Sequence, residues 1–227
     1  MVRQVENTIQ KIRGSLSEMW TLVEGQVERA SDALLNNNKN VAHEVRNLER
    51  MVDTYELMID RECEHFFALL NPVAVDMRLM ISILKINNDL ERIGDFANDI
   101  SKMVLANHRD NIPVELLEEL QLKKMFDEVL SMLNTCKLAF TAEAATKTSQ
   151  VFAQDDIVDT INRDALHILT KHMKEHPEHI YDCLQLSASI RRIERIGDRC
   201  SNIAEDIVFY LEARVLKHQG NEKKGTK

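Results

Sequence analysis

The chain contains the stretch Glu91-Arg92-Ile93-Gly94-Asp95 twice, because the same five residues recur at positions 194–198, 103 residues later. A glutamate and an aspartate four residues apart lie about 40° from each other around an α-helix, so both carboxylates point the same way. Two like charges at this spacing are mildly destabilising in water. Similar pairs are common along the chain, so the duplication is what distinguishes this one. A bound cation is one candidate for compensating the repulsion.

Two further landmarks recur at nearly the same distance. The tripeptide Val-Asp-Thr occupies residues 52–54 and 158–160, 106 positions apart, and Pro72 and Pro177 are 105 positions apart. Three landmarks in the same order indicate an internal repeat of roughly half the chain. Each half then carries two acidic pairs, one before its proline and one after it.

The composition predicts an all-α protein. The 227 residues include only 6 glycines and 3 prolines, and good helix formers are abundant. Apolar residues at spacings of three and four predict six long helices, and long helices in a compact chain are typical of bundles. The predicted helices span about 4–35, 41–69, 72–106, 114–145, 150–175 and 179–217, with turns or links at 36–40, 107–112 and 146–149.

The expected architecture is therefore two tandem three-helix bundles related by internal duplication. The first repeat should cover residues 1–108, the second should cover 109–217, and 218–227 should form a disordered tail. Whether the two bundles pack side by side or end to end is left open, since periodicity does not decide it.

The acidic pairs of each half should face one another. Asp53 lies 19 residues before Pro72, and Glu91 lies 19 residues after it. Positions equally far from the turn of an antiparallel helix pair reach the same height, so the pairs should meet across one interface about 8–10 Å between axes. The candidate metal ligands are Glu49, Asp53, Glu91 and Asp95 in the first half, Asp155, Asp159, Glu194 and Asp198 in the second, and Asp99 and Asn202 one turn further on.

Converging carboxylates repel unless they take up protons or cations, and all-oxygen sites suit hard cations such as magnesium, calcium and manganese, and also iron. Gly94 and Gly197 lie inside helices, where glycine is costly, so we expect close helix approach beside each site. Arg92 and Arg195 should pair with neighbouring carboxylates or await an anion. The alternative to a metal site is a solvated acidic face preserved by the duplication.

Other classes of function are disfavoured. The formal net charge of −8, with no basic run, argues against duplex DNA binding. The four cysteines are scattered, and the sequence shows neither a signal peptide nor an apolar run of membrane-spanning length, so we expect buried thiols in a soluble, cytoplasmic protein. The Glu-x-x-His motif of di-iron proteins occurs once, at residues 62–65, and neither a Walker loop nor a nucleophile elbow occurs. An enzyme is therefore not expected.

A second possible metal site involves histidines. His172 and His176 have the four-residue spacing of zinc ligands on a helix, and His167 and His179 lie nearby. Because the sequence offers no third convergent ligand, we expect these to be surface histidines.

The duplicated motif and the segment that opens its helix resemble the PhoU family. Residues 70–78, Leu-Asn-Pro-Val-Ala-Val-Asp-Met-Arg, are similar to the family's Pro-Val-Ala-x-Asp-Leu-Arg segment, and residues 202–205, Asn-Ile-Ala-Glu, also fit. The resemblance covers about residues 5–215. It implies that the four acidic pairs are the family's metal-binding motifs, which hold multinuclear clusters in some members. The metal would be iron, zinc, manganese or magnesium, and the difference between Asp99 and Asn202 leaves the two clusters free to differ.

The resemblance also implies a role. The chain would be a negative regulator of phosphate uptake and of phosphate-starvation signalling, contacting a phosphate ABC transporter's ATPase subunit and a sensor histidine kinase, and forming a homodimer. Two alternatives stay open. One is a carboxylate-bridged metalloprotein, either an enzyme or a metal store, and the other is an accessory of an ion-driven phosphate transporter.

Overall fold

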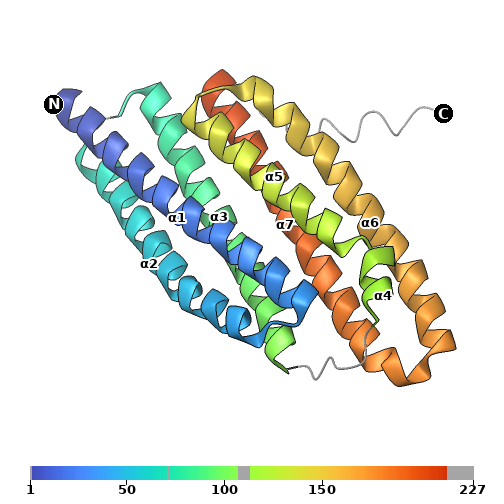
Figure 1. The fold of residues 1–227 in the computed structure, drawn as a ribbon. Helices are drawn as coiled ribbons and strands as arrows, with labels where there is room; N and C mark the ends of the chain where they lie inside the picture. Colours follow the sequence, from blue (N-terminus) through green and yellow to red (C-terminus); the bar gives the residue numbers. More distant parts are fainter. Residues whose placement is uncertain (1, 71, 107–112, 214–227) are drawn as a thin grey trace, which may run out of the picture.

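The computed structural model describes residues 2–70, 72–106 and 113–213, and these residues form helices without any strand. The predicted all-α fold is confirmed. The predicted link at 107–112 and tail at 218–227 lie outside the described residues. The helices are α1 (Val2–Asn36), α2 (Lys39–Leu69), α3 (Ala74–Ala106), α4 (Val114–Glu119), α5 (Leu122–Thr141), α6 (Thr148–Glu175) and α7 (Ile180–Glu212), with the single-turn 3-10 helices η1 (Ala145–Lys147) and η2 (Pro177–His179) (Figure 1).

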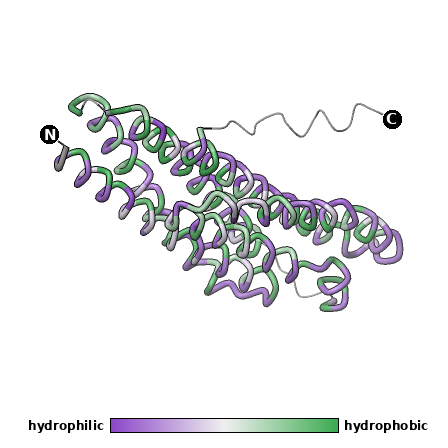
Figure 2. Tube along the Cα trace, turned by 90° about the horizontal axis from the view of Figure 1, so that it is seen from above, coloured by the Kyte–Doolittle hydropathy of each residue, from purple (hydrophilic) through white to green (hydrophobic). Residues whose placement is uncertain are grey.

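Each half forms a three-helix bundle, α1–α2–α3 and α5–α6–α7. Hydrophobic and hydrophilic residues alternate around every long helix (Figure 2), so each helix buries one apolar stripe. The buried aliphatic and aromatic side chains of both bundles belong to one continuous hydrophobic core. All four cysteines are buried and free, as predicted. None of the described helices has an apolar stretch long enough to cross a bilayer.

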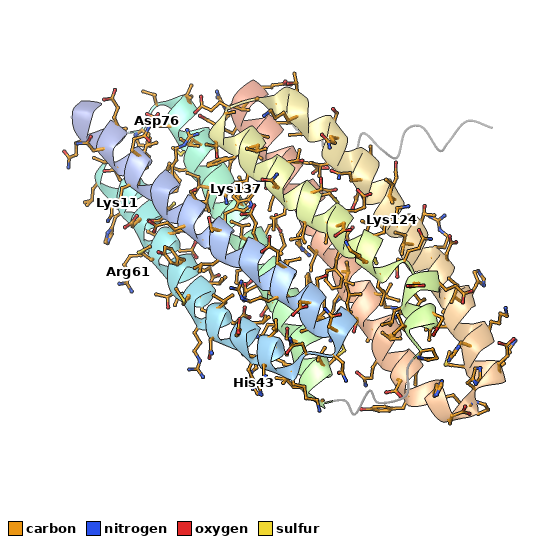
Figure 3. All side chains as sticks on the ribbon, viewed as in Figure 1. Lys11, His43, Arg61, Asp76, Lys124 and Lys137 are labelled. Atoms are coloured by element: carbon orange, nitrogen blue, oxygen red, sulfur yellow. The ribbon has the colours of Figure 1, made fainter. Side chains whose placement is uncertain are left out.

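The two bundles lie side by side, which settles the arrangement that periodicity left open. α3 packs against α7 and α1 against α5, while α2 and α6 occupy the outer edges (Figure 1). Lys137 of α5 reaches across to α1, where its ammonium lies 2.5 Å from Glu24 (Figure 3).

Contacts along α3 and α7 show that these two helices run antiparallel. The Ser82 hydroxyl donates to the Asp206 carbonyl at 3.0 Å, near the start of α3 and the end of α7. Further along α3, Asp99 accepts from the Arg192 guanidinium at 3.3 Å, nearer the start of α7. Gly94 and Gly197 fall between these two contacts on their helices. The duplicated motifs therefore lie at the same height in the middle of the molecule.

The predicted helix over 114–145 is wrong as a single element. α4 ends at Glu119, and Gln121 adopts a left-handed conformation with φ of 52° before α5 begins at Leu122. Leu116, Leu120 and Leu122 are all buried. A straight helix would place Leu120 and Leu122 about 200° apart around its axis, so the kink is what brings both inward. Neither glycine nor proline marks this position, so no residue pattern predicts the kink.

The connection into α6 also begins earlier than predicted. α5 ends at Thr141, and α6 has begun by Thr148, inside the expected break at 146–149. The reversal occurs at Glu143, with φ of 52°. The Glu143 carboxylate accepts hydrogen bonds from Arg13 at 2.6 Å and Tyr210 at 3.0 Å, which tie this turn to α1 and α7. These long-range contacts outweigh the local cost of the left-handed backbone.

Candidate metal centres in the two acidic clusters

Gly94 allows α1, α2 and α3 to approach closely beside the Glu91/Asp95 pair. A Cβ atom at Gly94 would lie 2.7 Å from Gln26 Oε1 on α1 and 3.3 Å from Glu49 Oε2 on α2. At Gly197 a Cβ would lie 3.0 Å from Asp155 Oδ1 and 3.7 Å from Met132 Cε. The predicted close approach of helices beside both sites is confirmed, and it is tighter in the first half.

Glu49 is the most enclosed carboxylate of the first cluster. It is 9% exposed and accepts hydrogen bonds from Gln26 Nε2 at 2.7 Å and Asn98 Nδ2 at 3.2 Å. Burial raises the pKa of Glu49 to about 7, while the two amide donors oppose the shift and the Asp95 carboxylate adds to it. The predicted meeting of the α2 and α3 pairs is therefore present, with Asp95 facing Glu49 across the interface.

Glu91 completes the pair on α3. Burial raises the pKa of Glu91 to about 7, and the nearby charge of Asp95 adds to the shift. Arg92 does pair with a neighbouring carboxylate, because its guanidinium donates to Asp95 Oδ2 at 3.0 Å. Its Nε lies 3.4 Å from Glu91 Oε2 without hydrogen-bond geometry, so that carboxylate oxygen stays buried without a donor.

Sequence reasoning missed Glu56 as a member of this cluster. The pKa of Glu56 is raised by burial first and then by the charges of Asp60 and Asp53, while Arg92 opposes the shift. The Asn87 amide, on α3, donates to the Glu56 carbonyl at 3.1 Å and to Asp60 Oδ1 at 2.9 Å. The spacings of three and four from Asp53 to Glu56 to Asp60 could have extended the predicted acidic face along α2.

The second cluster repeats the arrangement with fewer groups. Asp155 accepts a hydrogen bond from the Ser201 hydroxyl at 2.9 Å, and burial raises the pKa of Asp155 to about 6 despite that bond. The pKa values of Glu194 and Asp198 are also raised, by burial first and then by Asp198 and Asp159 respectively. The four carboxylates predicted for the second half therefore lie within electrostatic reach of one another.

Asn98 and Ser201 hold equivalent positions in the two repeats, 103 residues apart, and each donates to the first carboxylate of its cluster. Neither was among the predicted site residues, since their types differ. Asp99 has other partners, Arg192 at 3.3 Å and Lys102 at 3.1 Å. Asn202 is half-buried on α7. Asn98, rather than Asp99, is thus the residue of α3 that follows the motif and reaches the cluster.

The oxygen atoms of the first cluster are suitable ligands for a hard cation. Buried oxygens around the first cluster lack a hydrogen-bond donor, and oxygens of this kind are the ligands that such cations prefer. No three carboxylates in the described part of the chain place oxygens within 4.8 Å of one another. The oxygens without a donor are Gln26 Oε1, Asn87 Oδ1, Glu91 Oε2 and Asn98 Oδ1.

A family comparison reproduces the repeat. The PhoU domain matches residues 16–104 and 122–207. The chain belongs to the PhoU family. The two matched ranges cover α1–α3 and α5–α7 and leave out α4, so they follow the two bundles rather than the connection between them. The resemblance drawn from the motifs is thereby confirmed.

Known PhoU proteins are similar over almost the whole chain. The phosphate-specific transport system accessory protein PhoU homolog of Pseudomonas putida is 31% identical, over 96% of this chain and 84% of that one. The crystal structure of PhoU from Pseudomonas aeruginosa matches with a TM-score of 0.83 at 31% identity, covering 92% of this chain and 99% of that one. The phosphate transport system regulatory protein PhoU of Streptococcus pneumoniae gives 0.84 at 26% identity, covering 94% and 99%.

Proposed function

We propose that this chain is an accessory protein of a phosphate-specific transport system, and that it represses phosphate uptake and phosphate-starvation signalling. The observation that carries the proposal is the match of both repeats to PhoU, with both acidic clusters in place. Relatives that cover nearly the whole chain bear the transport-system name. The repression would act through protein–protein contact with the transporter's ATPase subunit and a sensor histidine kinase, with the chain as a homodimer.

Co-purification tests these contacts. The tagged chain should retain the phosphate transporter's ATPase subunit and the sensor kinase at high phosphate, and an ATPase subunit from an unrelated transporter should not be retained. Deleting the gene should raise phosphate-starvation reporter expression in phosphate-rich medium. Absence of association at every phosphate concentration would sink the proposed mechanism. Retention of an ion-driven phosphate transporter instead would favour that alternative.

The acidic clusters supply the second part of the proposal, two carboxylate metal sites. Glu49, Asp53, Glu91 and Asp95, joined by Glu56, would hold a cation between α2 and α3. Asp155, Asp159, Glu194 and Asp198 would do the same between α6 and α7. A bound cation would neutralise the clustered charge and link the two helices, and the buried oxygens without hydrogen-bond donors support this assignment for the first cluster. Iron, zinc, manganese and magnesium are the candidates.

Elemental analysis tests the metal sites. The wild type, purified without chelators, should contain metal, and Glu91→Ala/Asp95→Ala and Glu194→Ala/Asp198→Ala should each lose about half of the metal that the acidic clusters bind. If all three folded proteins hold only background metal, the clusters are acidic faces. A turnover assay for oxygen or hydrolytic chemistry on the metal-loaded wild type separates a regulator from a metalloenzyme, since only the enzyme would turn over.

A further inference from the structure

Three imidazoles gather at the turn between α6 and α7, far from the acidic clusters. His172 lies on the last turn of α6, His176 caps the C-terminus of that helix, and His179 ends η2. The ring centroids are 4.7 Å apart for His172 and His176, 5.3 Å for His172 and His179, and 5.5 Å for His176 and His179. The third convergent ligand that the sequence did not reveal is therefore His179.

The backbone of the turn explains this convergence. α6 stops at His176, whose N–H donates to the His172 carbonyl at 2.8 Å, and Pro177 opens the 3-10 turn. The His179 N–H then donates to the His176 carbonyl at 3.0 Å, which folds the chain back over the end of α6. These bonds are between backbone groups, and they bring the three side chains to the same end of the bundle.

The ligand atoms lie close to the separations that a metal requires. His172 Nε2 is 3.0 Å from His179 Nδ1, and His176 Nδ1 is 3.4 Å from Glu178 Oε1. Ligand atoms of His176, Glu178 and His179 all lie within 4.8 Å of one another, and no other group of three side chains in the described residues meets this criterion. Ligands of a tetrahedral zinc ion, at 2.0–2.1 Å from the metal, are roughly 3.3 Å apart.

Acidic groups lie around the three imidazoles. Histidines at a helix C-terminus can stabilise it when they are positively charged. Here, however, burial and the neighbouring His176 and His179 lower the pKa of His172. Glu175 and Glu119 lie close enough to affect His172, and Glu178 faces His176. These carboxylates would offset the charge of a cation.

We propose that His176, Glu178 and His179, with His172 as a fourth ligand, form a binding site for a borderline divalent transition metal such as Zn²⁺. His172 lies 13 residues beyond Asp159 on α6, about 20 Å along the helix axis, so this site is separate from the acidic clusters. Imidazole ligands also suit zinc better than all-oxygen ligands do. The His176 and Glu178 side chains are 47% and 64% exposed, so the ion can enter directly from solvent.

Zinc titration of the full chain tests the proposal. Metal-free wild type, His172→Ala/His176→Ala and the control His43→Ala should be titrated with Zn²⁺ against a chromogenic chelator at pH 7.5. His43 is exposed on α2, away from the cluster (Figure 3). Losing an outer-shell partner of a metal weakens binding about 10–100-fold, so losing two ligands should weaken one zinc site by at least ~100-fold. His43→Ala should behave as the wild type does.

Zinc bound by the acidic clusters must be distinguished from zinc bound by the histidines. The same titrations should be repeated with Glu91→Ala/Asp95→Ala and Glu194→Ala/Asp198→Ala, which should retain the histidine-dependent zinc ion. Imidazole proton resonances of the wild type supply a readout that needs no folded variant, and those of three histidines should shift with one equivalent of Zn²⁺. Unchanged zinc number and affinity in the histidine variant, or imidazole signals that do not move, would overturn the proposal.

Discussion

At the scale of single residues, the two motif glycines and an unrelated one make a matched set. Gly94 faces the buried Gln26 side chain, whose amide is bonded to Glu49, while a Cβ at the exposed Gly14 would meet nothing within 4 Å. We expect Gly94→Ala to lower the free energy of unfolding by about 1–3 kcal/mol, because overpacking must displace that amide. Gly14→Ala should raise it by up to about 1 kcal/mol, as alanine favours helix. Urea denaturation measures both.

The change in the free energy of unfolding for Gly197→Ala should lie between those of Gly94→Ala and Gly14→Ala, because the nearest atom to its Cβ would be Asp155 Oδ1 at 3.0 Å. We therefore predict that the free energy of unfolding increases from Gly94→Ala through Gly197→Ala to Gly14→Ala. Equal gains in the free energy of unfolding at Gly94 and Gly14 would show that helix propensity, rather than close packing, decides the effect of alanine.

The raised pKa of Glu91 makes the stability of the metal-free protein depend on pH. Its carboxyl has a pKa of about 7 when folded, against 4.5 for the free side chain, so the folded chain binds the proton more tightly. The free energy of unfolding should therefore fall as pH rises from about 4.5 to about 7 and level off above that range. Glu91→Gln should flatten this fall and stabilise the metal-free protein at pH 8 by up to about 3 kcal/mol.

Thermal melts of chelator-treated wild type and Glu91→Gln between pH 4.5 and 8.5 check this expectation. Glu18→Gln is a suitable control because Glu18 pairs with Tyr55 outside the cluster. Parallel pH profiles for wild type and Glu91→Gln would contradict the prediction.

The carboxylates of the site were predictable from sequence, but their partners were not. Acidic pairs that lie equally far before and after a proline should reach the same height along two antiparallel helices. In the structure, the Asp95 carboxylate of α3 is close enough to Glu49 of α2 to raise its pKa. Gln26 lies on α1, which carries none of the duplicated acidic motifs, so the motifs did not connect Gln26 with the site. Asn98 and Ser201 differ in type, so the repeat did not expose them as a matched pair of donors.

At the scale of elements, the kink between α4 and α5 depends on one unfavourable backbone conformation. Gln121 has φ of 52°, which costs an L-residue about 1–2 kcal/mol, whereas glycine adopts it freely. Part of the gain is lost because glycine is more flexible in the unfolded chain. We expect Gln121→Gly to raise the free energy of unfolding by roughly 0.5–1 kcal/mol.

The β-branched substitution Gln121→Val should have the opposite effect and destabilise the protein, since a branched Cβ fits the left-handed region poorly. Chemical denaturation of both variants beside wild type distinguishes them. If both destabilise equally, the Gln121 side chain, and not its backbone, stabilises the kink. Sequence patterns located the other long helices because each begins or ends at a proline, an asparagine cluster or a polar link.

At the scale of the whole molecule, the shared core should make the two repeats unfold together. Buried residues from α1, α3, α5 and α7 belong to one hydrophobic cluster, and buried or half-buried ion pairs join α3 to α7. Differential scanning calorimetry of the metal-free protein should give one transition, with calorimetric and van't Hoff enthalpies in a ratio close to one. Two resolved transitions would show that each bundle is stable alone.

The duplication was visible in the sequence, whereas the packing of its halves was not. Periodicity identifies the inward face of each helix within its own bundle. The faces that join the bundles contain residues such as Lys85 and Asp206, whose ion pair at 2.8 Å spans 121 positions of sequence. Charged residues of this kind look like solvent-facing positions until their partner is known.

The charges along the antiparallel contact of α3 and α7 also explain why the first repeat packs against the second rather than against another first repeat. Arg192 pairs with Asp99, and the counterpart of Arg192 in the first repeat, 103 residues earlier, is Asp89. Two first repeats associating in this way would set Asp89 against Asp99. Two second repeats would set Arg192 against Arg199, the residue that now binds Asp89. Repulsion between like charges thus disfavours the packing of either repeat against a copy of itself. The two repeats keep a similar backbone, and their different charges make the first repeat pack against the second.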